Sequence, residues 1–118
     1  MFGVGSVWWL EVEYEDISDS KVRPAIILEK TKDAIYFLVT TTTKAPGDPP
    51  SFYDKFKIPI INWRKIPLDQ ASYALSRRLI KLSESDLKNT IKENDYIGQM
   101  SLPDLQWLVT EIELRNRG

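Results

Sequence analysis

The residues best suited to chemistry in this sequence lie around the dipeptide Arg23-Pro24. The apolar run from Ala25 to Leu28 predicts a buried strand, and Pro24 stands at its expected first position, where a missing N–H is tolerated. The residue before a proline is held in an extended conformation. The guanidinium of Arg23 would therefore be fixed at the mouth of a sheet, where it can bind a phosphate. A surface arginine at the start of a strand is the simpler interpretation, and the spacing by itself favours it.

A second group of polar side chains follows the next apolar run, Ala34 to Val39. Four threonines and a lysine, Thr40 to Lys44, come directly after it. Threonine is β-branched and favours a strand, and its hydroxyl can donate a hydrogen bond to a phosphate. For at least two of the four threonines, a strand end that runs into solvent is the better explanation.

The net charge of −1 hides an uneven distribution along the chain. Residues 1–20 hold five acidic side chains and no basic one, whereas residues 55–81 hold seven basic side chains and a single acidic one, Asp69. A locally basic segment is the electrostatic signature of a polyanion-binding surface. Strand faces that carry scattered lysines into water explain the same pattern equally well.

The composition excludes several classes of site. The chain has no cysteine and no histidine, so disulfides, thiolate or histidine zinc sites and histidine acid–base catalysis are excluded. We expect neither a metal nor a cofactor. With 42% hydrophobic and 28% charged residues among 118, we expect one globular domain over residues 1–118. No apolar run approaches the ~20 residues of a membrane helix, and no export signal is recognisable, so we expect a cytoplasmic protein.

The pattern of apolar residues predicts a mainly β fold with C-terminal helices. Strands are expected over residues 4–12, 25–28, 34–39, 56–61 and 72–82, the last as one strand or a pair. Two neighbouring strands buried on both faces suggest the centre of a rolled or barrel-like sheet, and Pro59 places its own strand at an edge. The polar segment 13–20 is a candidate lid, and residues 45–51 form an exposed loop.

Two helices are expected after the last strand. Ser83 with Asp86 resembles a capping box, and Ser101 with Asp104 repeats the signal, with a break over residues 94–98 between them. The second helix has a clear inward face, formed by Leu105, Leu108, Val109 and Ile112.

The aromatic residues nearest the basic segment are candidate platforms for base stacking. Single-stranded RNA is bound by stacking as well as by cations, and Phe52, Tyr53 and Tyr73 lie close to that segment in the sequence. Core packing is the expected role of Tyr73, whereas the roles of Phe52 and Tyr53 are open.

The order of these motifs resembles that of a known family. Gly5-Ser6-Val7-Trp8 opens the first strand, Arg23-Pro24 leads the next, and Val39 to Lys44 ends the one after it. The region of Asn62-Trp63 and Ser72 follows, and then Ile97 to Ser101 before the last helix. Over roughly residues 3 to 114, this order and spacing are similar to those of the MazF/PemK (Kid) toxins of bacterial toxin–antitoxin modules.

The resemblance implies both a fold and an activity. The fold would be an SH3-like barrel that forms a homodimer. The activity would be that of a metal-independent endoribonuclease that cuts single-stranded RNA, often mRNA, at short sequences. The resemblance also implies a cognate antitoxin, whose flexible tail would occupy the RNA groove.

Carried over residue by residue, the family's catalytic arginine corresponds to Arg23. Its catalytic threonine, just past the apolar run, corresponds to Thr40, with Thr41 as the alternative if the register shifts by one. The residues expected to bind RNA are Lys21, Thr41, Thr42, Lys44, Arg77 and Arg78.

The expected mechanism is attack of the RNA 2′-OH on the adjacent phosphorus, which gives a cyclic phosphate and a free 5′-OH. Arg23 would clamp the phosphate and Thr40 would donate to it, because preorganised donors stabilise the charge that develops there. Arginine holds its protons strongly, so charge stabilisation is favoured over proton donation. The general base is unassigned, and Asp16 and Asp19 are candidates by position only.

Two other classes of function are open. A related barrel in the CcdB toxins binds DNA gyrase and cuts no nucleic acid. The chain could also be a non-catalytic SH3-like interaction module. Cleavage of RNA in vitro separates the nuclease from both alternatives.

Overall fold

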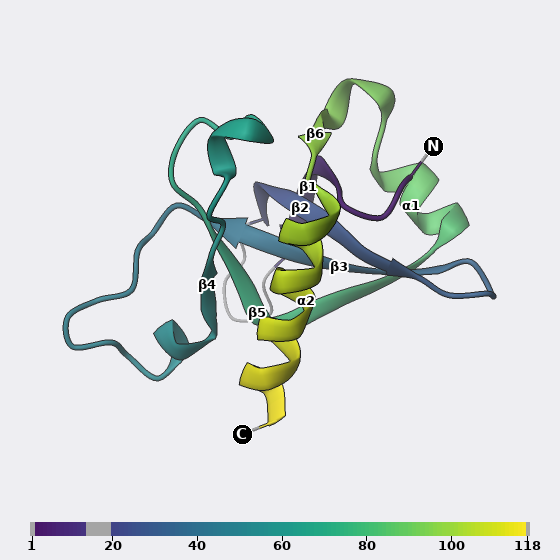
Figure 1. The fold of residues 1–118 in the computed structure, drawn as a ribbon. Helices are drawn as coiled ribbons and strands as arrows, with labels where there is room; N and C mark the ends of the chain where they lie inside the picture. The colour runs from purple at the N-terminus through teal and green to yellow at the C-terminus, as the bar shows by residue number, and fades with distance from the viewer. Residues whose placement is uncertain (1, 14–19, 118) are drawn as a thin grey trace.

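The computed structural model describes residues 2–13 and 20–117, and these form a curled antiparallel sheet with two helices packed against it (Figure 1). The sheet has six strands in the order β4-β5-β3-β2-β1-β6. The predictions of a mainly β chain, a rolled sheet and late helices are confirmed. The strands are β1 (Ser6–Glu13), β2 (Ser20–Lys30), β3 (Ile35–Thr42), β4 (Lys57–Pro59), β5 (Tyr73–Ser83) and β6 (Tyr96–Gln99).

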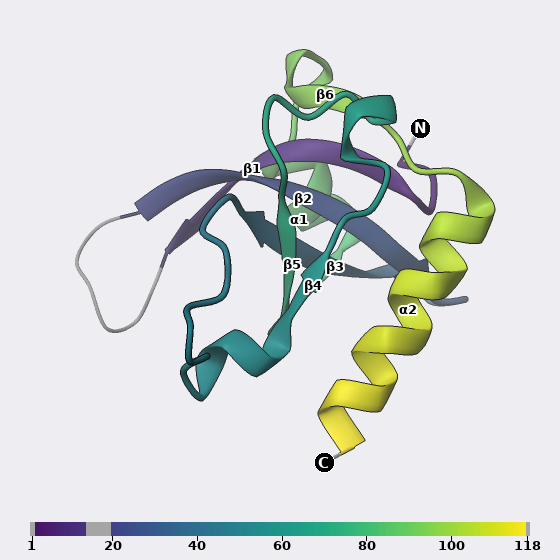
Figure 2. The same cartoon turned by 60° about the vertical axis from the view of Figure 1, so that its left-hand side comes forward.

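The helices and short turns occupy the connections and the end of the chain. Helix α1 (Glu84–Thr90) follows β5, and α2 (Leu102–Arg117) lies across one face of the sheet in both views (Figure 2). Three 3₁₀ turns complete the described elements: η1 (Tyr53–Phe56), η2 (Trp63–Lys65) and η3 (Glu93–Asp95). No helix among the described residues is long and apolar enough to cross a membrane.

The sequence signals place most strands correctly. The two strands with continuous apolar runs, β2 and β3, are central, and β4 with Pro59 is at an edge. The predicted segment 72–82 corresponds to a single strand, β5, which runs from Tyr73 to Ser83. The short strand β6 lies within a segment where we expected only a break, because Gly98 and the polar residues around it lower strand propensity.

The prediction that Pro24 opens its strand is wrong. β2 begins at Ser20, and Pro24 lies inside it, opposite Trp9 of β1. The proline is tolerated because the pairing between β2 and β3 ends at the next residue, where Ala25 faces Thr40. Proline has no N–H to donate, so it is tolerated at a position where backbone pairing on one side of the strand has ended.

Alternate residues of the central strands build two hydrophobic cores, one on each face of the sheet. Val7, Ile26 and Val39 belong to the core under α2, whereas Ile27 and Leu38 belong to the core that includes α1. The predicted inward face of α2 is confirmed, with Leu105, Leu108 and Ile112 buried and Val109 partly buried.

Both predicted helix caps are present. The backbone N–H of Asp86 donates to the hydroxyl of Ser83 at 3.2 Å, at the start of α1. The N–H of Asp104 donates to the hydroxyl of Ser101 at 3.3 Å, at the start of α2. These side chains satisfy backbone donors that a helix leaves free in its first turn.

Gly98 allows β6 to pack tightly against the segment that follows η2. A Cβ at this buried position would overlap the carbonyl oxygen of Ile66 and lie 2.6 Å from its carbonyl carbon. These are main-chain atoms, so relief would require a shift of the backbone. The glycine thus allows the start of the 66–72 connection, at Ile66 and Pro67, to lie directly against β6.

We predict that Gly98→Ala lowers the free energy of unfolding by about 1–3 kcal/mol or more, because overpacking forces the backbone apart. Gly3→Ala is the matched control, since a Cβ at Gly3 has no neighbour within 4 Å. Urea unfolding of both variants measures the difference. Equal midpoints for the two variants would contradict this account of Gly98.

Candidate functional site

A groove of about 790 Å³ lies at the end of the sheet where β2 and β3 separate. Its cationic and hydroxyl-bearing lining residues include Lys21, Arg23, Thr41, Thr42, Thr43 and Lys44. Its aromatic and aliphatic lining residues come from β1, β2, β6 and the 66–72 connection. The groove therefore presents two different chemistries to one ligand.

The separation of β2 and β3 follows from how their ladder ends. Past the Ala25–Thr40 pair, the Thr41 hydroxyl donates to the Pro24 carbonyl at 3.0 Å. Arg23 Nη1 donates to the Thr41 carbonyl at 3.2 Å. Side chains thus replace the backbone ladder at this point, and they hold the cation of β2 against the end of β3.

The side chain of Arg23 leaves β2 on the sheet face opposite to that of the Pro24 side chain. Arg23 is paired with buried Leu10, and Pro24 with exposed Trp9, so alternation places the two β2 side chains on different faces. The bond to the Thr41 carbonyl shows that the guanidinium nevertheless reaches the end of β3. Arg23 is half-buried, which limits its freedom.

The four threonines have different environments. Thr40 is buried and is absent from the residues that line the groove. Thr41 lines the groove, but the residue is only 1% exposed and its hydroxyl donates its hydrogen to the Pro24 carbonyl. Thr42 is half-buried and its hydroxyl accepts from the Lys44 N–H at 3.2 Å, which leaves its own hydrogen able to donate. Thr43 is exposed at the rim.

Asp69 is a groove residue that the sequence analysis did not select. It lies in the 66–72 connection beside Gln70, and both are exposed. Among the described residues that line the groove, Asp69 is the only carboxylate, and Lys21 and Lys44 line the same groove. The sequence carries a signal for this residue, because Asp69 is the single acidic residue of the basic segment 55–81.

Two aromatic residues of the groove were also missed. Trp9 on β1 is 40% exposed and Tyr96 at the start of β6 is 50% exposed, although both line the groove. The Tyr96 ring meets the edge of Trp8 at 5.0 Å between centroids. Alternation along β1, with Trp8 buried and Trp9 outward, was the available signal.

The predicted cations of β5 lie outside the groove lining. Arg77 is stacked against three aromatic rings, with its guanidinium carbon 5.1 Å from Phe52, 4.7 Å from Tyr53 and 5.7 Å from Phe56. Arg78 is exposed. Neither residue joins Lys21, Arg23 and Lys44, which do share the groove.

The three aromatic residues named as candidate stacking platforms also lie elsewhere. Phe52 and Tyr53 are exposed beside Arg77, and Tyr73 is half-buried. None of them lines the groove. Asp16 and Asp19, the positional candidates for the general base, lie outside the described residues, as does most of the proposed lid over 13–20.

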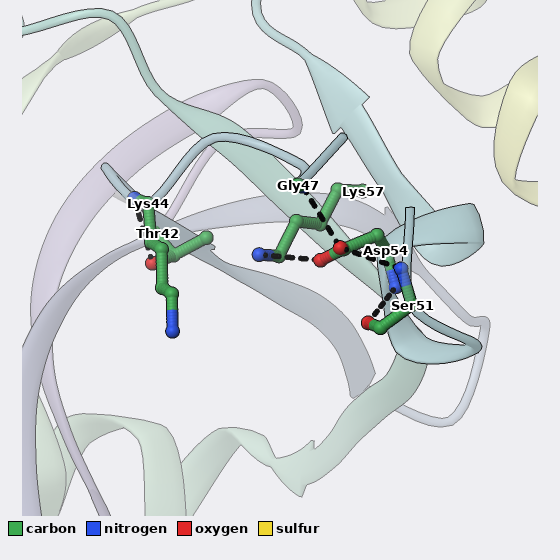
Figure 3. A network of polar contacts seen from close by, with 6 residues as sticks. All are labelled: Thr42, Lys44, Gly47, Ser51, Asp54 and Lys57. Atoms are coloured by element: carbon green, nitrogen blue, oxygen red, sulfur yellow. Dashed lines mark hydrogen bonds and ion pairs between the residues drawn. The ribbon is translucent and has the colours of Figure 1, made fainter. Parts of the chain in front are cut away.

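The loop beyond Lys44 is held by one carboxylate (Figure 3). Asp54 Oδ2 accepts the backbone N–H groups of Gly47 and Ser51, both at 2.9 Å, and Oδ1 lies 2.9 Å from Lys57 Nζ. The Gly47 amide, then the Ser51 amide and Lys57, hold the pKa of Asp54 well below its ordinary value. Because the charged form is favoured, this network persists from neutral pH into mild acid.

No group of three or more histidine, cysteine, aspartate or glutamate side chains that could hold a metal ion is found among residues 2–13 and 20–117. The polar groups of the groove are thus cations, hydroxyls, an amide and one carboxylate. This donor set is suited to an anionic ligand.

A scan against protein-family models finds none that matches this sequence, and a search among curated proteins finds no significant match. Function is therefore inferred from the side chains of the groove and from the order of the sequence motifs.

We predict that Asp54→Ala speeds hydrogen exchange at the Gly47 and Ser51 amides at neutral pH, because both lose their acceptor. The matched control is Asp48→Ala, which removes an exposed carboxylate of the same loop. Exchange is followed residue by residue by NMR. In the unsubstituted protein the two amides should stay protected at about pH 4, since the network is lost only as pH falls through the lowered pKa. Unchanged exchange in Asp54→Ala would show that the carboxylate does not hold the loop.

Proposed function

We propose that this protein is an endoribonuclease of the MazF/PemK toxin type, which cuts single-stranded RNA without a metal. The observation that carries the proposal is the bond from Arg23 to the Thr41 carbonyl. It joins a half-buried cation to the threonine-rich end of β3 at the wall of one groove. A phosphate in this groove would meet a fixed guanidinium and hydroxyl donors together.

The charge of the groove supports an RNA backbone as the ligand. Three cationic residues, Lys21, Arg23 and Lys44, line it against one carboxylate, Asp69. The two lysines are exposed, as is usual for contacts that position a backbone by charge. Arg23 is the more confined cation and is therefore the one suited to a single scissile phosphate.

In the proposed reaction, the 2′-oxygen of a ribose attacks the adjacent phosphorus and the bond from phosphorus to the 5′-oxygen breaks. The products are a 2′,3′-cyclic phosphate and a 5′-OH, with the 2′-proton passing to a base and a proton from solvent reaching the 5′-oxygen. Negative charge grows on the phosphoryl oxygens during this step. Arg23 would stabilise that charge, because a guanidinium confined at the wall of the groove is a preorganised cation for a phosphate bound there.

We assign the remaining roles from the groove geometry. Thr42 replaces Thr40 as the hydroxyl donor, because Thr40 is buried outside the lining and the Thr41 hydroxyl already donates to Pro24. Asp69 is the proposed base, since it is the carboxylate that shares the groove with Arg23 among the described residues.

The family type carries further proposals about fold and partners. The curled sheet would be the SH3-like barrel of these toxins, and two copies would associate as a homodimer. A cognate antitoxin would neutralise the protein by inserting an extended segment into the groove. The site of action would be the cytoplasm, where mRNA is available.

The test is cleavage of a long RNA by purified protein in the presence of EDTA. We expect cutting by the unsubstituted protein, with Arg23→Ala and Asp69→Asn each lowering the rate about 10²–10³-fold, as for loss of one preorganised group. Arg78→Ala is the matched control, because it removes an exposed arginine outside the groove. Mapping of the ends should find 2′,3′-cyclic phosphate and 5′-OH.

Full cutting by Arg23→Ala would remove Arg23 from the mechanism. A requirement for metal would reject the MazF/PemK assignment. Absence of RNA cleavage, with inhibition of DNA gyrase in a supercoiling assay, would instead favour the CcdB type of toxin. Absence of both activities would leave a non-catalytic interaction module.

A further inference from the structure

A second cationic surface lies outside the lining of the groove, where the turn η1 meets β5. The guanidinium carbon of Arg77 is 4.7 Å from the centre of the Tyr53 ring and 5.1 Å from that of the Phe52 ring. The Phe56 ring lies at 5.7 Å, and Lys55 Nζ lies 5.8 Å from the Phe52 ring. Cations at such distances are attracted to aromatic rings. We call these five residues the Arg77 cluster.

The segment of β5 that contains Arg77 is bulged. On β3, one residue separates Val39 from Thr41. On β5, four residues separate their partners, Leu79 and Ala74. The extra residues of β5 have no partners on β3, so the strand bends there and its side chains are re-aimed. Arg77 is one of these extra residues and is exposed.

Contacts on both sides of η1 hold this turn against the bulge. The Ser76 hydroxyl donates to the Phe56 carbonyl at 2.7 Å. Lys57, directly after η1, is paired with Leu75 of β5. The Lys57 ammonium also lies 2.9 Å from Asp54, whose carboxylate accepts two amides of the preceding loop (Figure 3). The rings are therefore fixed relative to Arg77, so little order has to be gained on binding.

The N–H groups of Arg77 are left for a ligand. Within residues 2–13 and 20–117, its guanidinium makes no hydrogen bond and no ion pair. Asp54, the acidic residue of η1, is already paired with Lys57, so the exposed charges of Arg77 and Lys55 are not neutralised by that carboxylate. The planar fork of arginine matches two oxygens of a phosphate.

The Arg77 cluster is joined to the groove by short stretches of chain. Thr42, which lines the groove, is paired with Tyr73 of β5. Arg77 is four residues further along β5, a span of at most about 14 Å of backbone. Lys44, which also lines the groove, lies in the loop that leads to η1. At a rise of ~3.4 Å per stacked nucleotide, about four nucleotides cover that span.

We propose that the Arg77 cluster is a second contact for the phosphate backbone of the RNA strand whose scissile linkage lies in the groove. The inference rests on the proposed function and deepens it, because it extends the path of the RNA beyond the groove. Arg77 binds a phosphate and Lys55 adds charge, whereas the three rings are positioning residues that hold the guanidinium. Contacts to the backbone carry no sequence information. The cluster thus raises the affinity for longer strands and leaves the choice of the cleavage site to the groove.

The test compares two pools of random RNA in which every 2′-OH is methylated, so that neither can be cut by 2′-attack. One pool has three nucleotides, too few to span from the groove to the Arg77 cluster, and the other has sixteen. Competition against a fluorescent RNA, followed by anisotropy, gives the dissociation constant of each. We expect Arg77→Ala to weaken binding of the sixteen-nucleotide pool about tenfold, as for the loss of one charged hydrogen-bond donor. Binding of the trinucleotide pool should not change.

The matched control is Arg78→Ala, since Arg78 is the neighbouring exposed arginine and does not belong to the Arg77 cluster. Arg23→Ala should weaken both pools, because it acts inside the groove. The salt dependence gives a second readout. For the sixteen-nucleotide pool, the slope of log K against log salt should fall by about 0.7 in Arg77→Ala, the value for one phosphate contact to a single strand. Arg77→Gln keeps most of the side chain without its charge, and it decides the outcome if Arg77→Ala fails to fold.

The rings are tested by Phe52→Ala and Tyr53→Ala. Each should weaken the sixteen-nucleotide pool less than Arg77→Ala does, because the cation remains but is held less firmly. The salt slope should stay unchanged, since no charge is lost. Trp107→Ala is the control, as Trp107 is a partly exposed aromatic residue of α2 outside the cluster.

The outcomes separate the second contact from the nuclease. If the protein cuts RNA but Arg77→Ala binds the sixteen-nucleotide pool normally, the second contact is wrong and the nuclease stands. Equal weakening of both pools by Arg77→Ala would also overturn it, because Arg77 would then act on the groove. If Arg77→Ala loses binding of a glutamate-rich peptide and keeps that of RNA, the surface belongs to an acidic protein and the proposal fails. If the unsubstituted protein neither binds nor cuts RNA, both proposals fail together.

Discussion

The end of the ladder between β2 and β3 is the constraint on which the groove depends. Pro24 has no N–H to give, and backbone pairing stops at its neighbour Ala25. The Thr41 hydroxyl then binds the Pro24 carbonyl, and Arg23 binds the Thr41 carbonyl. Two side-chain bonds thereby take the place of the backbone ladder and hold the end of β3 beside Arg23 and Pro24. The groove opens where they separate.

The surrounding elements hold the walls of that opening. The absence of a side chain at Gly98 lets the 66–72 connection, with Asp69, lie against β6. On the other side, Asp54 ties the loop after Lys44 to the start of β4 through Lys57. Each wall is thus positioned by a contact outside the groove. This arrangement lets the groove carry exposed charges on segments that have little regular structure of their own.

The groove combines two physical sources of affinity that are separately weak. Exposed cations such as Lys21 and Lys44 attract a polyanion over a distance, but salt screens them. A partly exposed ring such as that of Trp9 offers apolar area, but no long-range attraction. Under the proposed function, a single-stranded nucleic acid would engage both at once, whereas a duplex keeps its bases stacked inside. The more confined cation, Arg23, would then bind one particular phosphate of the chain.

The sequence by itself determined the local features: the central apolar strands, the edge strand at Pro59 and both helix caps. These follow from periodicity, proline chemistry and capping, which act over a few residues. The tertiary structure decided which threonine hydroxyl can still donate a hydrogen bond. It also placed Arg77 among aromatic rings, outside the lining of the groove. It likewise placed Asp69, Trp9 and Tyr96 among the residues that line the same groove as Arg23. Those outcomes depend on strand register and on the packing of distant loops, and a one-residue shift in register reverses which side chains face the groove.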